Sequence, residues 1–250
     1  MIVLKSTTEL DTMYEANRVV HRALGAVREA AAPGVSTLEL DSLAEELIRE
    51  AGGTPAFKGY HGFPATLCTS INDEIVHGIP SDKIRLKTGD LLSVDCGVVL
   101  DGFVGDAAIS FGIGPVDSTA ETLMKVTKRC LGDAVEQVGP GHRLGDIGAA
   151  VQARAEEAGF GVVREFVGHG IGRSMHEEPQ VPNYGKAGRG QVMKPGLVVA
   201  IEPMITAGSW RVKIDDDGWT ARTEDGKLAA HFEYSVAVTS DGHRVLGLEE

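Results

Sequence analysis

The sequence lacks the features that mark several protein classes. No run of 18 or more apolar residues occurs, so we expect no membrane-spanning helix. The first residues, MIVLKSTTELD, reach acidic side chains too early for a secretory signal peptide. Cysteine is scarce, with three residues in the chain. Cys68, Cys96 and Cys130 are far apart in the sequence and form no C-x-x-C pair. This pattern predicts reduced thiols in a cytoplasmic protein rather than a disulfide framework.

Positive charge is also in deficit. Lysine and arginine together number 24 against 36 aspartates and glutamates, which gives a net charge of −12 at pH 7. This balance argues against nucleic acid or an anionic membrane as the main partner. It would suit cation binding, although most acidic proteins bind no metal. The chain has 250 residues, of which 42% are hydrophobic, and can bury one well-packed domain or two small ones.

Helix signals occur in pairs along the chain. The capping-box spacing of a serine followed three residues later by a glutamate occurs at Ser6, Ser36 and Ser118, and it predicts three helix starts. Apolar residues then recur at helical spacing, as in Leu38, Leu40, Leu43, Leu47 and Ile48. Gly52 and Gly159 are placed to end two of these helices.

Motifs that recur 107 residues apart (33 to 140) indicate two related halves. Pro33-Gly34 recurs as Pro140-Gly141, and the EAG triplet at 50–52 recurs at 157–159. Further on, LKTGDLLSVD (86–95) matches MKPGLVVAIE (193–202). The repeat is too long for a solenoid unit. We therefore expect an α+β fold, in which two helix pairs related by pseudo-two-fold symmetry cover a curved, largely antiparallel sheet, with halves at about 6–111 and 117–240.

The repeat pairs two carboxylates at strand ends. Asp95 ends the apolar run LLSVD, and Glu202 ends the matching run LVVAIE. A buried carboxylate is costly unless it is paired with a charge or a metal. Each residue alone could lie in solvent at its strand end. Their equivalent places in the two halves favour a shared site.

A hairpin extends this site. Asp101-Gly102 is a strong turn signal, and a turn there sets Gly97 opposite Asp106 and Asp95 opposite Ala108. Asp95 and Asp106 then project from the same face, about 7–8 Å apart or less. Two like charges in such positions repel each other unless a cation lies between them.

The second half offers a fourth carboxylate. EYSVAV (233–238) resembles DAAISF (106–111), so Glu233 mirrors Asp106, displaced by a longer connection at 207–230. Four carboxylates require one or two multivalent cations. Oxygen ligands alone suit Mg, Mn or Ca, whereas an added imidazole widens the choice to Mn, Fe, Co, Ni or Zn.

The stretch VGHGIGRSMHEEPQVPNY (167–184) supplies the imidazole. Three glycines beside His169 let the backbone approach a metal closely, so we predict that His169 is a ligand. A histidine in a loop is more often polar surface, but the four converging carboxylates favour the ligand role here.

Together these residues resemble the type I methionine aminopeptidases, of the short bacterial kind. The matching segments span most of residues 60–240: YHGFPATLCTSINDEIVHGIP, LLSVDCGVVLDGFVGDAAISF, VGHGIGRSMHEEPQVPNYG, AIEPMITAG and DGWTARTEDGKLAAHFEYSVAVT. The resemblance implies the duplicated pita-bread fold and a single catalytic metallopeptidase domain over residues 1–250. It also implies removal of the N-terminal methionine from nascent proteins and peptides whose second residue is small.

The resemblance further implies a site with two divalent metal ions, of Mn, Fe, Co, Ni or Zn. Asp106 and Glu233 would bridge them, Asp95 would chelate one, and His169 and Glu202 would complete the other. Glu202 would also serve as general base toward the attacking water.

The resemblance assigns two further histidines to the reaction. His176 would donate a hydrogen bond to the scissile carbonyl as negative charge develops there. His77 would contact the scissile amide and assist proton delivery, although from the sequence alone it could equally be a loop histidine packed against Pro80.

The resemblance also implies an apolar methionine pocket, formed by Tyr60, Phe63, Cys68, Met175 and Trp219. Any one of these could instead belong to a small satellite core. Met175 stands where close relatives carry Phe, and smaller residues replace hydroxyl-bearing or bulkier ones near the ligands at Gly97, Ala107 and Ala108.

The expected partners are nascent polypeptide N-termini, encountered near the ribosome, with no nucleic acid or membrane and with the protein as a monomer. No zinc-finger extension that would dock on the ribosome precedes the motifs. Two rivals stay open at this stage: an aminopeptidase P or prolidase on the same fold, and a non-catalytic binding protein. The roughly 60 residues before YHGF leave little room for the extra domain of the first rival. The second usually loses metal ligands, which are all present here.

Overall fold

The computed structural model describes residues 2–249. Within that range the helices are α1 (Thr7–Ala30), α2 (Thr37–Glu50), α3 (Ser118–Val135) and α4 (Leu144–Glu157). The strands are β1 (Thr54–Pro55), β2 (Leu67–Ile71), β3 (Glu74–Val76), β4 (Leu91–Leu100), β5 (Phe103–Gly112), β6 (Gly161–Val162), β7 (Gly168–Gly170), β8 (Glu177–Val181), β9 (Val198–Ile201), β10 (Met204–Thr206), β11 (Val212–Ile214), β12 (Ala221–Thr223), β13 (Ala229–His231), β14 (Glu233–Val238) and β15 (His243–Val245).

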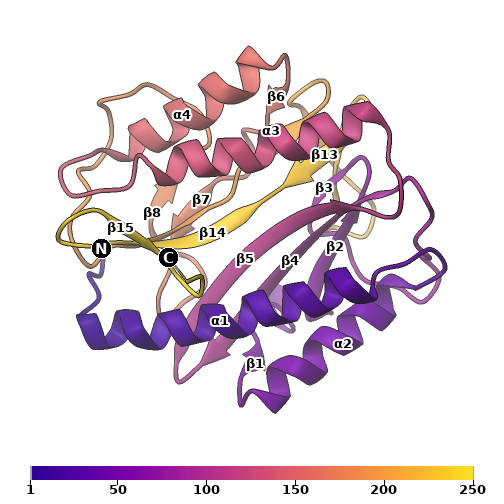
Figure 1. Ribbon diagram of the computed structural model, residues 1–250, viewed down its shortest axis with the longest axis horizontal. Coiled ribbons are helices and arrows are strands. Elements are labelled where there is room, and N and C mark those ends of the chain that lie inside the picture. Colours follow the sequence, from indigo (N-terminus) through magenta and orange to yellow (C-terminus); the bar gives the residue numbers. More distant parts are fainter. Residues whose placement is uncertain (1, 250) are drawn as a thin grey trace.

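A large antiparallel sheet occupies the centre of the molecule (Figure 1). Its strands run in the order β1-β4-β5-β14-β9-β7-β8, with β2 added beside β4 and β15 beside β14. Every pairing in this sheet is antiparallel. β5 and β14 come from different halves of the sequence and meet in the middle. The predicted α+β class with a curved antiparallel sheet is therefore confirmed.

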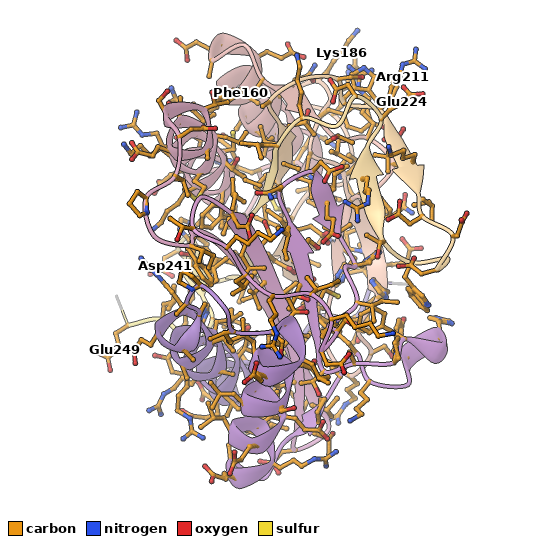
Figure 2. The ribbon with its side chains drawn as sticks, turned by 90° about the vertical axis from the view of Figure 1, so that its right-hand side faces the viewer. Phe160, Lys186, Arg211, Glu224, Asp241 and Glu249 are labelled. Carbon is orange, nitrogen blue, oxygen red and sulfur yellow. The ribbon has the colours of Figure 1, made fainter. Side chains whose placement is uncertain are left out.

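Figures 1 and 2 show all four helices on one face of this sheet, with α1 and α2 over one half and α3 and α4 over the other. Under α1 and α2 lies an apolar core built with β2, β4 and β5. A second core joins α3 and α4 to β9 and β14. The helical stripe predicted for α2 is buried at Leu40 and Ile48, but Leu38 is 41% exposed and lies outside it.

Serine caps begin the first two helices, as predicted. The hydroxyl groups of Ser6 and Ser36 accept hydrogen bonds from the backbone of Glu9 and Glu39, whose carboxylates accept bonds in return. The third prediction was off by one residue. α3 is capped by Asp117, whose carboxylate accepts from the Ala120 N–H, and the helix begins at Ser118.

The 107-residue spacing reappears in the positions of the elements. α2 ends at Glu50 and α4 at Glu157, and Gly52 and Gly159 follow with φ of 79° and 77°. One backbone bridge joins Ser36 to Arg85, and another joins Arg143 to Val192. The duplication of the chain stays an interpretation, and these correspondences agree with it.

The β4–β5 hairpin has the predicted register. Asp101 and Gly102 both have positive φ, 49° and 77°, as a two-residue hairpin turn requires. Asp95 lies opposite Ala108, and Asp106 lies opposite Gly97. The turn chemistry therefore places both aspartates on one face of the sheet.

The connection expected at 207–230 is partly ordered into strands. β11 and β12 form a hairpin that pairs with β3. The loop between these two strands carries Trp219. Figure 2 shows Lys186, Arg211 and Glu224 together at this end of the molecule, pointing outwards.

Two further expectations concern the cysteines and membranes. Cys68, Cys96 and Cys130 are free, as predicted, and all three are buried. Among residues 2–249, none of the helices combines the length and the apolar character that a membrane crossing requires.

Helix α1 rests directly on the backbone of β5. A Cβ atom added at Gly105 would lie 2.7 Å from the Ala16 carbonyl carbon and from the Asn17 nitrogen. A contact this short with backbone can be relieved only by moving the helix. By contrast, a Cβ at Gly25, within α1, would meet nothing within 4 Å.

We expect Gly105→Ala to lower the free energy of unfolding by about 1–3 kcal/mol, because the methyl group overpacks the α1–β5 contact. Gly25→Ala is the matched control and should be neutral or stabilising by up to about 1 kcal/mol, since alanine favours a helix interior. Urea unfolding of both variants measures the difference. Equal stability of the two would contradict the proposed contact.

Candidate active site

Five strands bring the five predicted metal ligands together. Asp95 lies in β4, Asp106 in β5, and Glu233 begins β14. These three strands are consecutive neighbours in the sheet, and Ala108 of β5 faces both Asp95 and Glu233. Next in the sheet are β9, which Glu202 follows directly, and β7, which carries His169. Both halves of the chain thus contribute to one cluster.

The side-chain atoms of this cluster are close enough to share a cation. One ligand atom each from Asp106, His169 and Glu233 lie within 4.8 Å of one another. The Nε2 atom of His169 is 3.8 Å from Oδ2 of Asp106 and 3.6 Å from Oε1 of Glu202. These distances are too long for hydrogen bonds. They are short enough for one cation to lie between the nitrogen and the carboxylate oxygens.

Burial of these carboxylates changes their acidity. Removal from water raises the pKa of Asp95 to about 7. Burial, and then repulsion from Asp95, raises the pKa values of Asp106 and Glu202 well above the usual range. For Glu233 the causes are burial and repulsion from Asp106. The protein alone does not stabilise four negative charges at this place.

A divalent cation fits the donors that are present. Within residues 2–249, Oδ1 of Asp95, Oδ1 of Asp106 and Oε1 of Glu233 are buried without a hydrogen-bond partner. Unpartnered buried carboxylate oxygens are unfavourable unless a cation completes them. Four carboxylates and one imidazole form a donor set that suits first-row divalent ions.

His169 is oriented for such a role. Its Nδ1 atom is 2.9 Å from the Gly170 carbonyl oxygen, so Nδ1 carries the proton and donates it. The Nε2 lone pair then faces the carboxylates, as in a histidine ligand. Burial, together with His176, lowers the pKa of His169 to about 4 and keeps the ring neutral.

The carboxylate cluster forms one wall of a cavity of about 230 Å³. All twelve predicted site residues line this cavity. The complete lining consists of Phe57, Tyr60, His61, Phe63, Cys68, His77, Asp95, Asp106, His169, Met175, His176, Glu202, Trp219 and Glu233. The polar and the apolar residues predicted for the site therefore line one cavity.

His176 is held by a neighbouring phenol. The Tyr60 hydroxyl lies 2.8 Å from Nδ1 of His176. Burial, and then the nearby His61, lowers the pKa of His176, so its ring is neutral near pH 7. If Tyr60 donates to Nδ1, the proton of the ring is on Nε2, which is then free to donate to a bound molecule.

His77 lies against two aromatic rings. Its ring meets Phe166 edge to face at 5.3 Å and Trp219 at 6.4 Å. Burial, then His176, lowers the pKa of His77 to about 4. Its backbone has a φ of 63°, an uncommon conformation outside glycine that is often found at functional sites.

The apolar wall adjoins the carboxylates directly. Cys68 of β2 is the cross-strand partner of Asp95, and Phe63 meets Trp219 at 5.1 Å. Burial, then Asp95, raises the pKa of the Cys68 thiol well above its usual range, so it is a neutral, weakly polar surface. A side chain bound against this wall would lie next to the carboxylate cluster.

Sequence reasoning missed Phe57 as a lining residue. A Cβ atom at Gly97 would lie 2.6 Å from the Phe57 ring and 2.9 Å from the terminal methyl of Met175. Gly97 therefore leaves room for both side chains. This contact joins residues far apart in the chain, and only the apolar character of Phe57 in TPAFKGYHGF could have hinted at it.

His61 and His231 were also missed as site residues. His61 lines the cavity, with a φ of 47°. His231 is fully buried, its Nε2 atom lacks a hydrogen-bond partner and lies 3.8 Å from Oε2 of Glu233. Burial lowers the pKa of His231 to about 3. Its position two residues before Glu233 was the available signal.

Comparison with known proteins defines the class. The family model described as metallopeptidase family M24 matches residues 11–240, nearly the whole chain. The chain therefore belongs to the M24 metallopeptidases, a family that implies divalent-metal binding. This agrees with the buried carboxylate–imidazole cluster and confirms that the protein is a metal-dependent hydrolase.

Full-length relatives narrow the class to one kind of enzyme. A methionine aminopeptidase of Clostridium acetobutylicum is 49% identical over the whole length of both chains. Methionine aminopeptidase 1 of Mycobacterium tuberculosis is 50% identical, over 98% of this chain and 94% of its own. The crystal structure of methionine aminopeptidase from Thermotoga maritima has a TM-score of 0.98 at 42% identity, with full coverage of both chains. The resemblance drawn from the motifs is confirmed.

The rival on the same fold is a more distant match. A prolidase from Pyrococcus furiosus superposes with a TM-score of 0.79 at 22% identity, and the match covers 66% of that chain. This likeness shows the shared pita-bread fold alone. The comparisons favour a methionine aminopeptidase over the prolidase alternative.

The buried carboxylates predict how stability depends on pH. A carboxyl group whose pKa is higher in the folded protein binds protons more tightly there, so the stability it provides is lost as pH rises. Between about pH 7 and 8 the buried histidines are mostly neutral in both states, so their contribution, which has the opposite sign, is small. We expect the metal-free protein to lose on the order of 5 °C in melting temperature across this window.

Added Mn²⁺ should raise the melting temperature more at pH 8 than at pH 7, because the cation competes with protons for the same oxygens. Differential scanning fluorimetry at several pH values measures both effects. Asp216→Asn, which changes an exposed carboxylate, is the control and should follow the unaltered protein. A metal-induced shift that is equal at both pH values would refute the assignment.

Proposed function

We propose that this protein removes the N-terminal methionine from polypeptides whose second residue is small, by metal-assisted hydrolysis of the first peptide bond. One observation carries the proposal: a largely buried cluster of four carboxylates and one imidazole forms a wall of the same cavity as an apolar pocket. The relatives named methionine aminopeptidase, identical at 49% and 50% of positions, support this substrate over others.

The cluster would hold two divalent ions, of Mn, Fe, Co, Ni or Zn. Asp106 and Glu233 lie on the adjacent strands β5 and β14, at the centre of the five ligands, and would bridge the ions. Asp95 would chelate one ion, and His169 with Glu202 would complete the other. Each of the three neighbouring carboxylates, at 95, 106 and 233, has an oxygen without a hydrogen-bond partner.

When bound, such ions polarise the scissile carbonyl and lower the pKa of the attacking water toward neutrality. Glu202 would accept the proton of the attacking water, since its carboxyl group belongs to the cluster and its affinity for protons is raised by burial. Its backbone carbonyl accepts a hydrogen bond of 3.0 Å from Asn183, which holds the strand end in place.

Two neutral histidines act on the substrate side. His176 donates from Nε2 to the carbonyl oxygen as negative charge develops, while Tyr60 fixes the ring through Nδ1. His77 contacts the scissile amide and relays a proton to the departing amine. With a pKa of about 4, His77 is neutral near pH 7 and serves as a hydrogen-bonding relay rather than as a resident cation.

Methionine selectivity comes from the apolar wall. Tyr60, Phe63, Cys68, Met175 and Trp219 would enclose the unbranched thioether side chain, whose flexibility suits an irregular pocket. Because Cys68 faces Asp95 across the strands, the side chain in the pocket lies next to the ions. A large second residue would clash there, so small second residues are favoured.

The biological setting follows from this substrate. Nascent chains near the ribosome would be the partners, and the cytoplasm would be the location. We propose that residues 1–250 form a single catalytic domain with two related halves, acting as a monomer.

We expect the protein with added Mn²⁺ to hydrolyse Met-Ala-Ser and to leave Met-Lys-Ser and Ala-Pro peptides intact. Asp106→Asn should lower kcat/KM by at least about 100-fold, because losing a bridging ligand removes several kcal/mol of transition-state stabilisation. Chromatography of the released methionine measures both. Asp216→Asn is the control with an exposed carboxylate. Cleavage of Ala-Pro peptides only, or full activity of Asp106→Asn, would overturn the proposal.

The loop that carries Met175 and His176 is fixed from the N-terminal segment. Lys5, with a side chain 3% exposed, forms a 2.6 Å ion pair with Glu177. The other oxygen of Glu177 accepts hydrogen bonds from the backbone of Arg173 and Ser174, at 2.9 and 3.3 Å. The buried pair thus joins two distant segments and holds the turn in front of His176.

We expect Lys5→Met to lower kcat about tenfold with KM within threefold, because a displaced His176 loses a hydrogen bond made mainly in the transition state. Arg154→Met removes a pair of similar length, 2.7 Å to Asp133, on the helices of the other half, and is the control. Steady-state kinetics with Met-Ala-Ser separate the two parameters. Equal kcat in both variants would show that Lys5 does not position the loop.

A further inference from the structure

The backbone of Asp106 lies where two central strands separate. β14 pairs with β5 only through Glu233 and Tyr234. Beyond that point β14 pairs with β15 instead, beginning with Val236 opposite Val245. Asp106 is the first residue of β5 past the end of this ladder. Buried backbone groups at such a place need other partners.

Two buried side chains supply these partners. The Asp106 N–H donates to Oδ1 of Asn17, at 3.2 Å, and the Ser235 hydroxyl donates to the Asp106 carbonyl oxygen, at 2.9 Å. Both side chains belong to fully buried residues. Asn17 comes from helix α1 and Ser235 from strand β14, so Asp106 is held from two sides at once.

Asn17 itself has little freedom to move. Its amide nitrogen donates to the Met13 carbonyl oxygen, at 2.9 Å, one turn earlier in α1. The helix backbone at Asn17 is enclosed by two glycines: a Cβ at Gly105 would lie 2.7 Å from its nitrogen, and one at Gly247 would lie 2.5 Å from its carbonyl carbon. The acceptor oxygen is therefore presented to β5 from a fixed position.

The Asp106 carboxylate depends on this backbone for its direction. Its Oδ1 atom is buried and has no hydrogen-bond partner among the described residues. A side chain with few bonds of its own points where its backbone directs it. By contrast, the Asp41 carboxylate is held by two N–H groups, those of Thr66 and Leu67.

We infer that Asn17 and Ser235 are positioning residues that set the backbone of Asp106 and thereby tune the affinity and geometry of the divalent-metal site. The inference rests on the proposed function only in taking Asp106 as a ligand. Groups that orient metal ligands typically change affinity by about 10- to 100-fold when they are removed.

The test uses the full-length apoprotein titrated with Mn²⁺ alone in a calorimeter, below the melting temperature of every variant. Asn17→Ala and Ser235→Ala should each weaken Mn²⁺ binding by about tenfold or more. They should also change the visible absorption spectrum of the Co²⁺-loaded protein, which reports ligand geometry. A general loss of packing in the apoprotein would lower the melting temperature without moving either signal.

Thr127→Val is the matched control. Thr127 is fully buried in α3 and donates to the Leu123 carbonyl oxygen, one turn earlier, at 2.8 Å, but it contacts none of the proposed ligands. Its variant should keep the Mn²⁺ affinity and the Co²⁺ spectrum of the unaltered protein, even if its melting temperature falls.

Mn²⁺ affinities and Co²⁺ spectra equal to those of the control, in both variants, would overturn the inference. If Asn17→Ala does not fold, Ser235→Ala alone decides. The proposed function is judged separately, on the unaltered protein. Mn²⁺ binding without release of methionine would refute the function and leave the positioning role standing, whereas absence of Mn²⁺ binding would refute both.

Discussion

Mutual repulsion among buried carboxylates is the constraint on which this structure depends. Asp106 and Glu233 are buried, and Asp95 and Glu202 are largely so. Loss of hydration raises the pKa of each of the four, and each carboxylate raises the energy of the others' ionised forms. In a low-dielectric interior such charges are tolerated only with compensation. The fold brings them together from both halves of the chain, so a cation bound by them would hold the two halves to each other.

The surrounding structure supports this cluster without competing with it. The Asp106 N–H donates to Asn17 and the Asp106 carbonyl oxygen accepts from Ser235, whereas Oδ1 of its carboxylate has no hydrogen-bond partner among the described residues. Nδ1 of His169 donates to the Gly170 carbonyl oxygen, and the lone pair of Nε2 stays directed at the carboxylates. The apolar wall begins one strand away, where Cys68 faces Asp95. A single cross-strand pair thus joins the apolar wall to the carboxylate cluster, and one cavity can hold a side chain against the wall with its backbone at the carboxylates.

Local chemistry made much of this predictable from the sequence. The Asp101-Gly102 turn determines the register of the hairpin. The position of that turn alone therefore predicts that Asp95 and Asp106 project from the same face of the sheet. The 107-residue repeat then pointed to Glu202, and the likeness of EYSVAV (233–238) to DAAISF (106–111) pointed to Glu233. Contacts between distant segments could not be derived in this way. Phe57 against Gly97, and Lys5 against Glu177, depend on tertiary packing that leaves no periodic signal, and the β11–β12 hairpin lay in a segment read as a connection.

The scattered origin of the ligands has a consequence for biosynthesis. The cluster needs Glu233, near the end of the chain, and α1 is closed against Gly247, whereas Asn17 belongs to the first helix. A polypeptide still emerging from the ribosome, or one terminated before β14, holds an incomplete and strongly repulsive set of acids with no strand beside β5 to complete it. Translation therefore produces no partly working intermediate: the catalyst comes into existence only when its last strands join the first helix.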